Sequence, residues 1–327
     1  MASYAARRAL VALSEPDPGR VAPPAVLPRA LGLQALLEQA DRHGVLPAVL
    51  RNLQSLGAGA ADLAPARRRL LERTALTLKL RGQLAELRKA LAAAGVVPIV
   101  LKGPVFAERL YGEPALRPFT DLDLLIDRAT WPAAERAMAQ LGYRSRHEAG
   151  RKHADAYGEE TFRLAADATA GAVELHWNLV NSPALRAGLS VTYDDLGGGG
   201  DDGKGLSPEA LLVIAAVHGA ASHQFDRLGL LWDVALAVRG EGGTVEIDAL
   251  QPILYRTGAA RAMRMALHLV DVVLGERAAR VLARQLHLGR PDALERALLT
   301  PAVVLDTDGR LSVARRLGFR QRLKRRL

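Results

Sequence analysis

The sequence predicts an α+β protein in which a small mixed sheet is flanked by helices and lies between two helical regions of the chain. Apolar residues recur at helical spacing up to Gly95 and again after Ser207. Between these two points, short apolar runs are separated by glycines and prolines, and several of them alternate as strands do. We therefore expect a helical part, a small sheet and a second helical part, in that order.

The N-terminal region, residues 1–94, is predicted to be helical from about Leu31, with a break near 56–65. Its second half, 70–91, carries leucines and alanines at helical spacing and ends at Gly95, a residue that commonly stops a helix. This region is expected to contribute helices that cover the sheet.

The sheet is expected within residues 95–196. The apolar run at 96–101 predicts a buried strand, and Pro104 to Tyr111 predicts a short helix after a glycine turn. The other elements expected here are strands over 121–126, 160–164 and 172–179, and a helix over 130–141 capped by Thr130.

Residues 197–206 are rich in glycine and are expected to form a flexible surface loop, a reading we prefer to a phosphate cradle because the loop also holds two aspartates. Ser207 and Pro208 are a good helix start. They open a helical domain, 207–300, with helices expected over 209–222, 228–238, 247–255, 259–274 and 277–286. A basic tail, 301–327, follows.

Composition and charge restrict the classes of function. The chain has 44 basic and 35 acidic residues, a net charge of +9, and eight basic residues without an acid lie between Gly309 and Leu327. The rest of the chain is nearly neutral, which argues against a phosphate-tracking surface. The tail is expected to be a disordered, solvated end, in preference to a grip on RNA, an acidic membrane or an acidic partner.

Cysteine is absent, which excludes disulfides, thiolate metal sites and a cysteine nucleophile. No apolar run approaches the roughly 18 residues that a membrane-spanning helix needs. The short apolar stretch near the N-terminus does not suffice for a signal peptide. A cytoplasmic location is therefore expected.

Two aspartates, Asp121 and Asp123, lie two residues apart within an apolar strand. Because side chains of a strand alternate, both carboxylates are expected on one face and Leu122 and Leu124 on the other. On its own the spacing also fits a solvated acidic strand face. Paired carboxylates at the edge of a buried sheet suit a divalent metal bound to a nucleoside triphosphate.

The surrounding residues favour the metal site. The turn at Lys102-Gly103 precedes the pair, and Arg117 lies within reach of a phosphate, which arginine binds in a bidentate manner. A later strand places Glu174 and His176 on one face.

Together these motifs resemble the uncharacterised bacterial nucleotidyltransferase family of the polymerase-β superfamily. The resemblance covers roughly residues 70–274 and also includes His218 and Leu231-Trp232-Asp233. It rests on the segments Leu101-Lys102-Gly103, Leu110-Tyr111-Gly112, Arg117, Asp121-Leu122-Asp123 and Glu174-Leu175-His176-Trp177.

The resemblance implies a polymerase-β-type core in which three carboxylates hold two Mg²⁺ ions, with Mn²⁺ as an alternative. Asp121 and Asp123 are then metal ligands, and Glu174 is a third ligand or the base that deprotonates an acceptor hydroxyl. The Gly103 backbone and Arg117 are expected to position the β- and γ-phosphates. His176 is expected to support a ligand carboxylate rather than bind metal.

The implied reaction moves a nucleoside monophosphate from a triphosphate such as ATP to a hydroxyl or phosphate of an unknown acceptor: a peptide, a saccharide or a small molecule. His218 and Asp233 are expected on the acceptor side. Lys102 departs from the Gly-Ser or Gly-Gly of better-studied members. It either contacts a phosphate or is the extended end of a strand. The alternatives are a tailoring transferase that uses a sugar nucleotide, and a non-catalytic nucleotide- or RNA-binding module.

Overall fold

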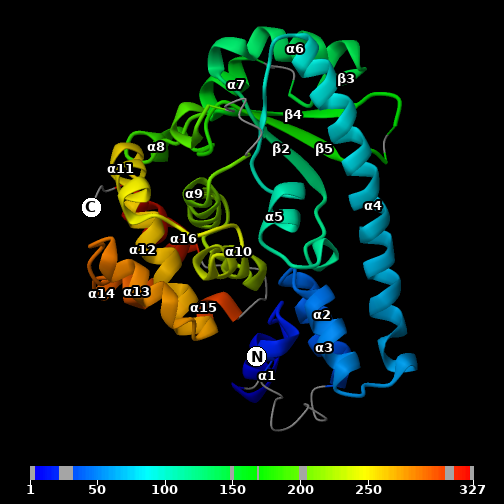
Figure 1. Cartoon of the computed structure of the whole chain (residues 1–327), viewed down its shortest axis with the longest axis vertical. Helices are drawn as coiled ribbons and strands as arrows, with labels where there is room; N and C mark the ends of the chain where they lie inside the picture. The colour runs from blue at the N-terminus through cyan, green and yellow to red at the C-terminus, as the bar shows by residue number, and fades with distance from the viewer. Residues whose placement is uncertain are drawn as a thin grey trace.

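The computed structural model describes residues 4–21, 32–147, 151–167, 169–198, 205–305 and 313–324, and it has the predicted α+β architecture. Figure 1 shows the sheet at one end of the molecule and the N-terminal helices at the other. The long helix α4 (Ala60–Ala93) runs along one side between them.

The N-terminal region is helical, as predicted, but the expected break is shorter than 56–65. Helix α4 already begins at Ala60 and continues through Pro65. Because a proline lacks the backbone donor, the helix loses one hydrogen bond near its start rather than ending there. The preceding elements are α1 (Tyr4–Leu13), the 3₁₀ turn η1 (Pro18–Arg20), α2 (Gly32–Arg42) and α3 (Leu46–Ser55).

Only some of the regularly spaced leucines of α4 are buried. Leu84, Leu87 and Leu91 are buried under the sheet, whereas Leu71 and Leu78 are 69% and 64% exposed. The middle of α4 runs from the N-terminal helices to the sheet (Figure 1), and Leu80 there is fully buried in the same cluster.

The sheet has five strands in the order β1-β2-β5-β4-β3. Strands β2 and β5 are parallel and the other pairs are antiparallel. The predicted strands are present with shifted ends, and β3 and helix α7 were not predicted. The bounds are β1 (Ile99–Val100), β2 (Asp121–Leu125), β3 (Tyr143–Ser145), α7 (Arg151–Tyr157), β4 (Glu159–Leu164) and β5 (Ala172–His176).

The two faces of the sheet differ in chemistry, as the alternation predicted. Leu122, Leu124, Val173 and Leu175 lie in one apolar cluster with α4 and α6 (Trp131–Gln140). Thr130 precedes α6, but its hydroxyl donates to the Asp127 carbonyl and does not cap the helix, so that part of the prediction was wrong. The opposite face carries the carboxylates.

Short elements connect the strands: α5 (Pro104–Arg109), η2 (Pro114–Leu116), η3 (Arg128–Thr130), α8 (Pro183–Arg186) and η4 (Asp194–Leu196). The glycine-rich segment follows. Its residues 199–204 lie outside the described residues, so the choice between a surface loop and a phosphate cradle is not tested. Ser207 then caps the next helix by accepting a hydrogen bond from the Ala210 amide, as predicted.

The C-terminal part is helical, and its apolar residues join those of the N-terminal helices in one large core. No described helix is both long enough and apolar enough to cross a membrane. The elements are α9 (Pro208–His218), the π turn η5 (Gly219–His223), α10 (Leu228–Arg239), α11 (Ile247–Thr257), α12 (Ala260–Leu269), the π turn η6 (Val270–Leu274), α13 (Arg277–Gln285), α14 (Ala293–Leu298), α15 (Pro301–Leu305) and α16 (Val313–Leu323).

The prediction of a disordered basic tail was wrong for residues 313–323, which form α16. Phe319 is fully buried, with its ring 6.3 Å from that of Phe225, and Leu323 is also buried. Arg322 pairs with Asp292 of the segment before α14 at 2.8 Å. The apolar side chains between the arginines supply a packing face that the charge count concealed.

His43 connects the N-terminal helices to α10 at a fully buried position. Its Nδ1 accepts a hydrogen bond from the Leu228 amide at 3.2 Å. Burial, which disfavours the charged imidazolium, lowers the pKa of His43 to about 4 from its usual 6.5. The ring is therefore neutral at neutral pH.

We predict that this histidine makes the fold sensitive to acid. On acidification the unfolded chain takes up the proton first, so the contribution is complete above pH 6.5 and is lost as the pH falls toward 4. The free energy of unfolding should fall by about 3 kcal/mol over that window. Denaturant unfolding at a series of pH values measures it.

His43→Asn keeps an acceptor at the Nδ1 position and should give a shallower slope, despite lower overall stability from lost packing. His287→Asn, at an exposed position, is the control and should leave the slope unchanged. Equal slopes in all three proteins would contradict the prediction.

Candidate active site

The carboxylates of the polar sheet face lie together because β2 and β5 are parallel neighbours. Their register pairs Asp123 with Glu174 and Leu125 with His176. Asp121, Asp123, Glu174 and His176 line one cavity of about 250 Å³. The structure thus brings the predicted acid pair and the predicted third carboxylate to one place.

Lys102 enters the same cavity from the turn after β1. The turn is sharp because Gly103 has φ +56°, ψ −111°, a conformation that an L side chain rarely adopts. The Lys102 Nζ lies 3.0 Å from Asp123 Oδ2 and 3.7 Å from Asp121 Oδ2. Of the two readings of Lys102, the structure therefore favours an ammonium group directed into the site.

Burial and the neighbouring charges together set the pKa values of Asp123, Asp121 and Lys102. Burial opposes ionisation of Asp123, but Lys102 and His176 outweigh it and hold the pKa of Asp123 well below its usual range. Burial and the Asp123 charge raise the pKa of Asp121. For Lys102, burial is outweighed by Asp123 and Asp121, so its pKa is raised and it stays charged.

Glu174 is the carboxylate suited to proton transfer. Burial, with repulsion from Asp123, raises the pKa of Glu174 to about 7. A base is most effective when its pKa lies near the working pH. Glu174 therefore fits either of its predicted roles, as a metal ligand or as a base.

His176 lies between three carboxylates. Its Nε2 is 3.4 Å from Asp123 Oδ1 and 3.8 Å from Glu174 Oε2, and its Nδ1 is 3.3 Å from Glu159 Oε2. Burial alone would lower the pKa of His176, but the Asp123 and Glu159 carboxylates raise it. The ring is placed to donate to a ligand carboxylate or to bind a metal itself.

Helix α9 and the π turn η5 form the opposite wall of the cavity. His218 and His223 lie there, with ring centroids 4.8 Å apart. Burial lowers the pKa of both histidines. The positive charge of Lys102 adds to this effect for His218, and that of Arg227 adds to it for His223, whose pKa falls to about 4. Two neutral imidazoles therefore face the carboxylates across the cavity, and the acceptor-side role of His218 stays a prediction.

The backbone of this wall is unusual. A π turn ends α9, and Gln224 and Phe225 follow with φ of 55° and 53°. Gly219 accommodates the tight path, since a Cβ there would lie 2.4 Å from the Phe225 ring. π turns and strained residues concentrate at functional sites.

Arg117 and Asp233 are brought together, but away from the cavity lining. Arg117 Nε and Nη2 donate to the two oxygens of Asp233, each at 2.7 Å, and Tyr111 donates to the same carboxylate at 3.0 Å. The Arg117 guanidinium also lies over the Phe106 ring at 5.1 Å. The phosphate role of Arg117 and the acceptor role of Asp233 stay predictions.

The residues present fit a divalent metal. Ligand atoms of Asp123, Glu174 and His176 all lie within 4.8 Å of one another. Asp123 Oδ2 lies 3.0 Å from the Lys102 ammonium, while both His176 ring nitrogens are buried without an aligned hydrogen bond among the described residues. Buried polar atoms are seldom left so. Carboxylate oxygens suit Mg²⁺ or Mn²⁺, and Asp121 lies beside them at the cavity wall.

Sequence reasoning missed Glu159, Asn181, Ser222 and His223, which also line the cavity. Glu159 begins β4, one residue before the predicted strand, and alternation from the correct start would have placed it on the polar face. The positions of Ser222 and His223 depend on the π turn, for which the sequence carries no clear signal.

The fold and the cavity define an α+β protein with a cluster of carboxylates that suits a divalent metal. Residues 30–275, well over half of the chain, match the model of a family described as "Uncharacterised nucleotidyltransferase". The chain belongs to this nucleotidyltransferase family, which confirms the resemblance. No curated protein and no solved structure matches the chain.

We predict that the Arg117–Asp233 pair is a strong structural link. Both side chains are largely buried, so removing one partner leaves an uncompensated charge. Asp233→Asn and Arg117→Met should each lower the free energy of unfolding by about 3–5 kcal/mol. The double variant should lose clearly less than the sum, as measured by denaturant unfolding.

Asp155→Asn is the matched control, because it breaks the exposed Arg128–Asp155 pair at 3.1 Å and should cost at most about 1 kcal/mol. Additive losses for the two buried changes would show that the residues do not act as a pair.

Proposed function

We propose that the protein is a divalent-metal-dependent nucleotidyltransferase that transfers a nucleoside monophosphate from a nucleoside triphosphate to a hydroxyl or phosphate of an acceptor. The observation that supports this most is the convergence of Asp121, Asp123 and Glu174 on one cavity wall. A nucleotidyltransferase family match over residues 30–275 supports the same reaction class.

Each carboxylate has a role that follows from its charge. Asp123, whose pKa is held well below its usual range, is the central metal ligand, with Asp121 two residues before it on β2 and Glu174 paired with it on β5. Bound Mg²⁺ would neutralise the phosphates and polarise the bond that breaks. Glu174, with its pKa near 7, accepts the proton of an attacking hydroxyl when it is not bound to metal.

Lys102 would then bind the phosphates of the triphosphate. Its ammonium already offsets the charge of Asp123 and Asp121, and phosphate oxygens entering the cavity offer it a second set of acceptors. The cavity of about 250 Å³ is smaller than the roughly 300–1,000 Å³ of ordinary ligand pockets. It therefore suits the phosphates, and the nucleoside would extend beyond it.

The neutral histidines His218 and His223 face the carboxylates from the helical wall, where the acceptor would approach. A neutral imidazole accepts a hydrogen bond from a hydroxyl and does not compete for the metal-bound phosphates as a cation would. This arrangement favours a hydroxyl-bearing acceptor between α9 and the sheet.

The first prediction for this site concerns Asp123. Asp123→Asn should lower kcat for transfer of a labelled nucleoside monophosphate by at least about 100-fold, because it removes the central negative charge of the site. Activity is measured with Mg²⁺ or Mn²⁺ and a mixture of hydroxyl acceptors, or as slow hydrolysis of the triphosphate.

Asp127→Asn is the control: Asp127 lies just past the end of the same strand, is exposed, and an asparagine there still accepts from the Ala129 amide. It should retain full activity. Turnover by Asp123→Asn at the wild-type rate would refute the proposed role of the carboxylates.

The second prediction concerns the donor. Thermal unfolding with a panel of nucleoside triphosphates and sugar nucleotides should show a rise in Tm of several degrees for a triphosphate with Mg²⁺, since a ligand stabilises the state that binds it. The Mg²⁺-dependent part of the shift should disappear in Asp123→Asn.

A larger shift with a sugar nucleotide would instead identify the tailoring transferase, which uses the same fold on a peptide or saccharide acceptor. No shift with either class would leave the cavity without a nucleotide ligand and would contradict both assignments.

A further inference from the structure

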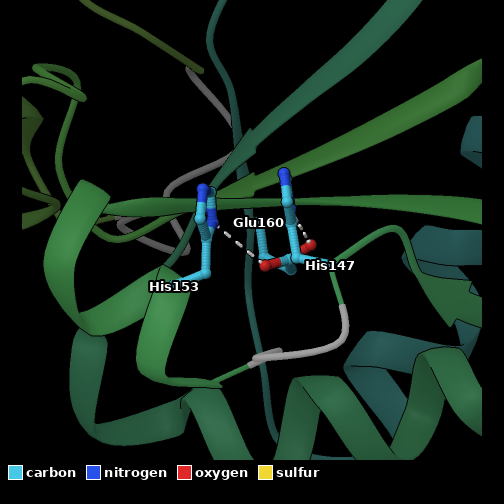
Figure 2. A group of neighbouring side chains, drawn as sticks. All are labelled: His147, His153 and Glu160. Carbon is cyan, nitrogen blue, oxygen red and sulfur yellow. Dashed lines mark hydrogen bonds and ion pairs between the residues drawn. The ribbon is translucent and has the colours of Figure 1, made fainter.

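Two histidines and a glutamate gather on the face of the sheet that the candidate active site does not use. His147 follows β3, His153 lies on α7, and Glu160 lies on β4. Figure 2 shows the two rings side by side, with the carboxylate of Glu160 joined to both by dashed lines. One ligand atom from each residue lies within 4.8 Å of the others.

The surroundings of Glu160 point to a missing partner. The side chain is 1% exposed, and its Oε1 lies 3.0 Å from the Ser145 hydroxyl and 2.8 Å from His147 Nδ1. Its Oε2 lies 3.2 Å from His153 Nδ1, yet these two buried atoms form no aligned hydrogen bond, with each other or with another described residue. Polar atoms buried in this way are normally satisfied.

The two histidine rings lie against each other. The His147 and His153 rings are stacked, with centroids 3.7 Å apart and planes inclined by 14°. Each ring carries a nitrogen whose lone pair can bind a metal ion.

We propose that His147, His153 and Glu160 form a binding site for a divalent transition-metal ion, Zn²⁺ in its chemistry. Two imidazole nitrogens and one carboxylate oxygen are a ligand set that zinc accepts, with a fourth position left for water. Mg²⁺ prefers oxygen ligands alone. The ion would supply the partner that Glu160 Oε2 and His153 Nδ1 lack.

Coordination by both rings requires them to turn out of their parallel stack, because each lone pair must point at the ion. His147 is the ring with room to turn, since its side chain is 38% exposed, against 22% for His153. The Tyr157 ring, 4.6 Å from His153, supports the other ring from behind. Ser145 holds the carboxylate in place, as residues around a metal ligand commonly do.

The site is separate from the proposed catalytic metals. Glu160 pairs across the sheet with Leu175 on the apolar face, whereas its neighbour Glu159 lies at His176 on the polar face. An ion at Glu160 would fasten α7 and the segment after β3 to the start of β4.

The test is a titration of the metal-stripped full-length protein with Co²⁺, followed by competition with Zn²⁺, in excess Mg²⁺. Tetrahedral Co²⁺ has visible absorption bands that report its ligands. The wild-type protein and Asp123→Asn should both show a bound Co²⁺ spectrum that Zn²⁺ displaces, since the site does not use Asp123.

His147→Asn, a change at a partly exposed position, should lose this spectrum and weaken Zn²⁺ binding by at least about 100-fold. Ser145→Ala should weaken it by about 10- to 100-fold, and His287→Asn should bind as the wild type does. Zn²⁺ should also raise the Tm of Asp123→Asn but not that of Asp123→Asn/His147→Asn.

Unchanged Zn²⁺ affinity in His147→Asn, or a spectrum lost in Asp123→Asn and kept in His147→Asn, would overturn the assignment. The second result would place the ion at Asp123, Glu174 and His176. Neither result depends on nucleotidyl transfer, so the metal site and the proposed function can fail independently.

Discussion

The buried carboxylate of Asp123 is the constraint to which the rest of the site responds. An isolated charge at that depth is very unfavourable, and the protein offsets it with the Lys102 ammonium at 3.0 Å and the His176 ring at 3.4 Å. Glu174 lies beside Asp123, and burial together with the Asp123 charge raises its pKa to about 7. The parallel pairing of β2 and β5 places Asp123, Glu174 and His176 on one face of the sheet, and the turn after β1 brings Lys102 to them. The negative charge of Asp123 is already offset without a metal. A divalent ion entering the cavity would take over part of the role that Lys102 and His176 now have.

The wall of the cavity formed by α9 and η5 is held in place relative to the sheet by buried hydrogen bonds and an ion pair. Arg117 and Tyr111, from the segment between β1 and β2, bind Asp233 of α10. His43 binds the start of the same helix from the N-terminal side. Helix α10 packs on α9, which carries His218. The long N-terminal region and the helical C-terminal part therefore position the wall formed by α9 and η5, although among the described residues neither part supplies a carboxylate to the cavity.

Much of this arrangement could be predicted from the sequence because it depends on local patterns. Alternation placed Asp121 with Asp123 and Glu174 with His176, and apolar spacing and helix stops located most helices. The errors arose where non-local packing decides. Phe319 and Leu323 are buried against helices that precede them, so residues 313–323 are ordered despite their charge. The pairing of Arg117 with Asp233, over 100 residues away, and the course of the π turn at His223 leave no trace in local spacing.

Strand β4 carries two adjacent glutamates that serve opposite faces of the sheet, Glu159 at His176 and Glu160 at His147 and His153. Because the side-chain period of a strand is two, a slip of a single residue would turn each of them to the other face. One glutamate would then take the position of the other, the remaining cluster would lose its carboxylate, and Phe162 would turn out of its apolar layer. Point substitutions in β4 can therefore be tolerated separately at each face, whereas an insertion or deletion between Gly158 and Phe162 would damage both. The fold therefore constrains the length of this segment more strictly than its composition.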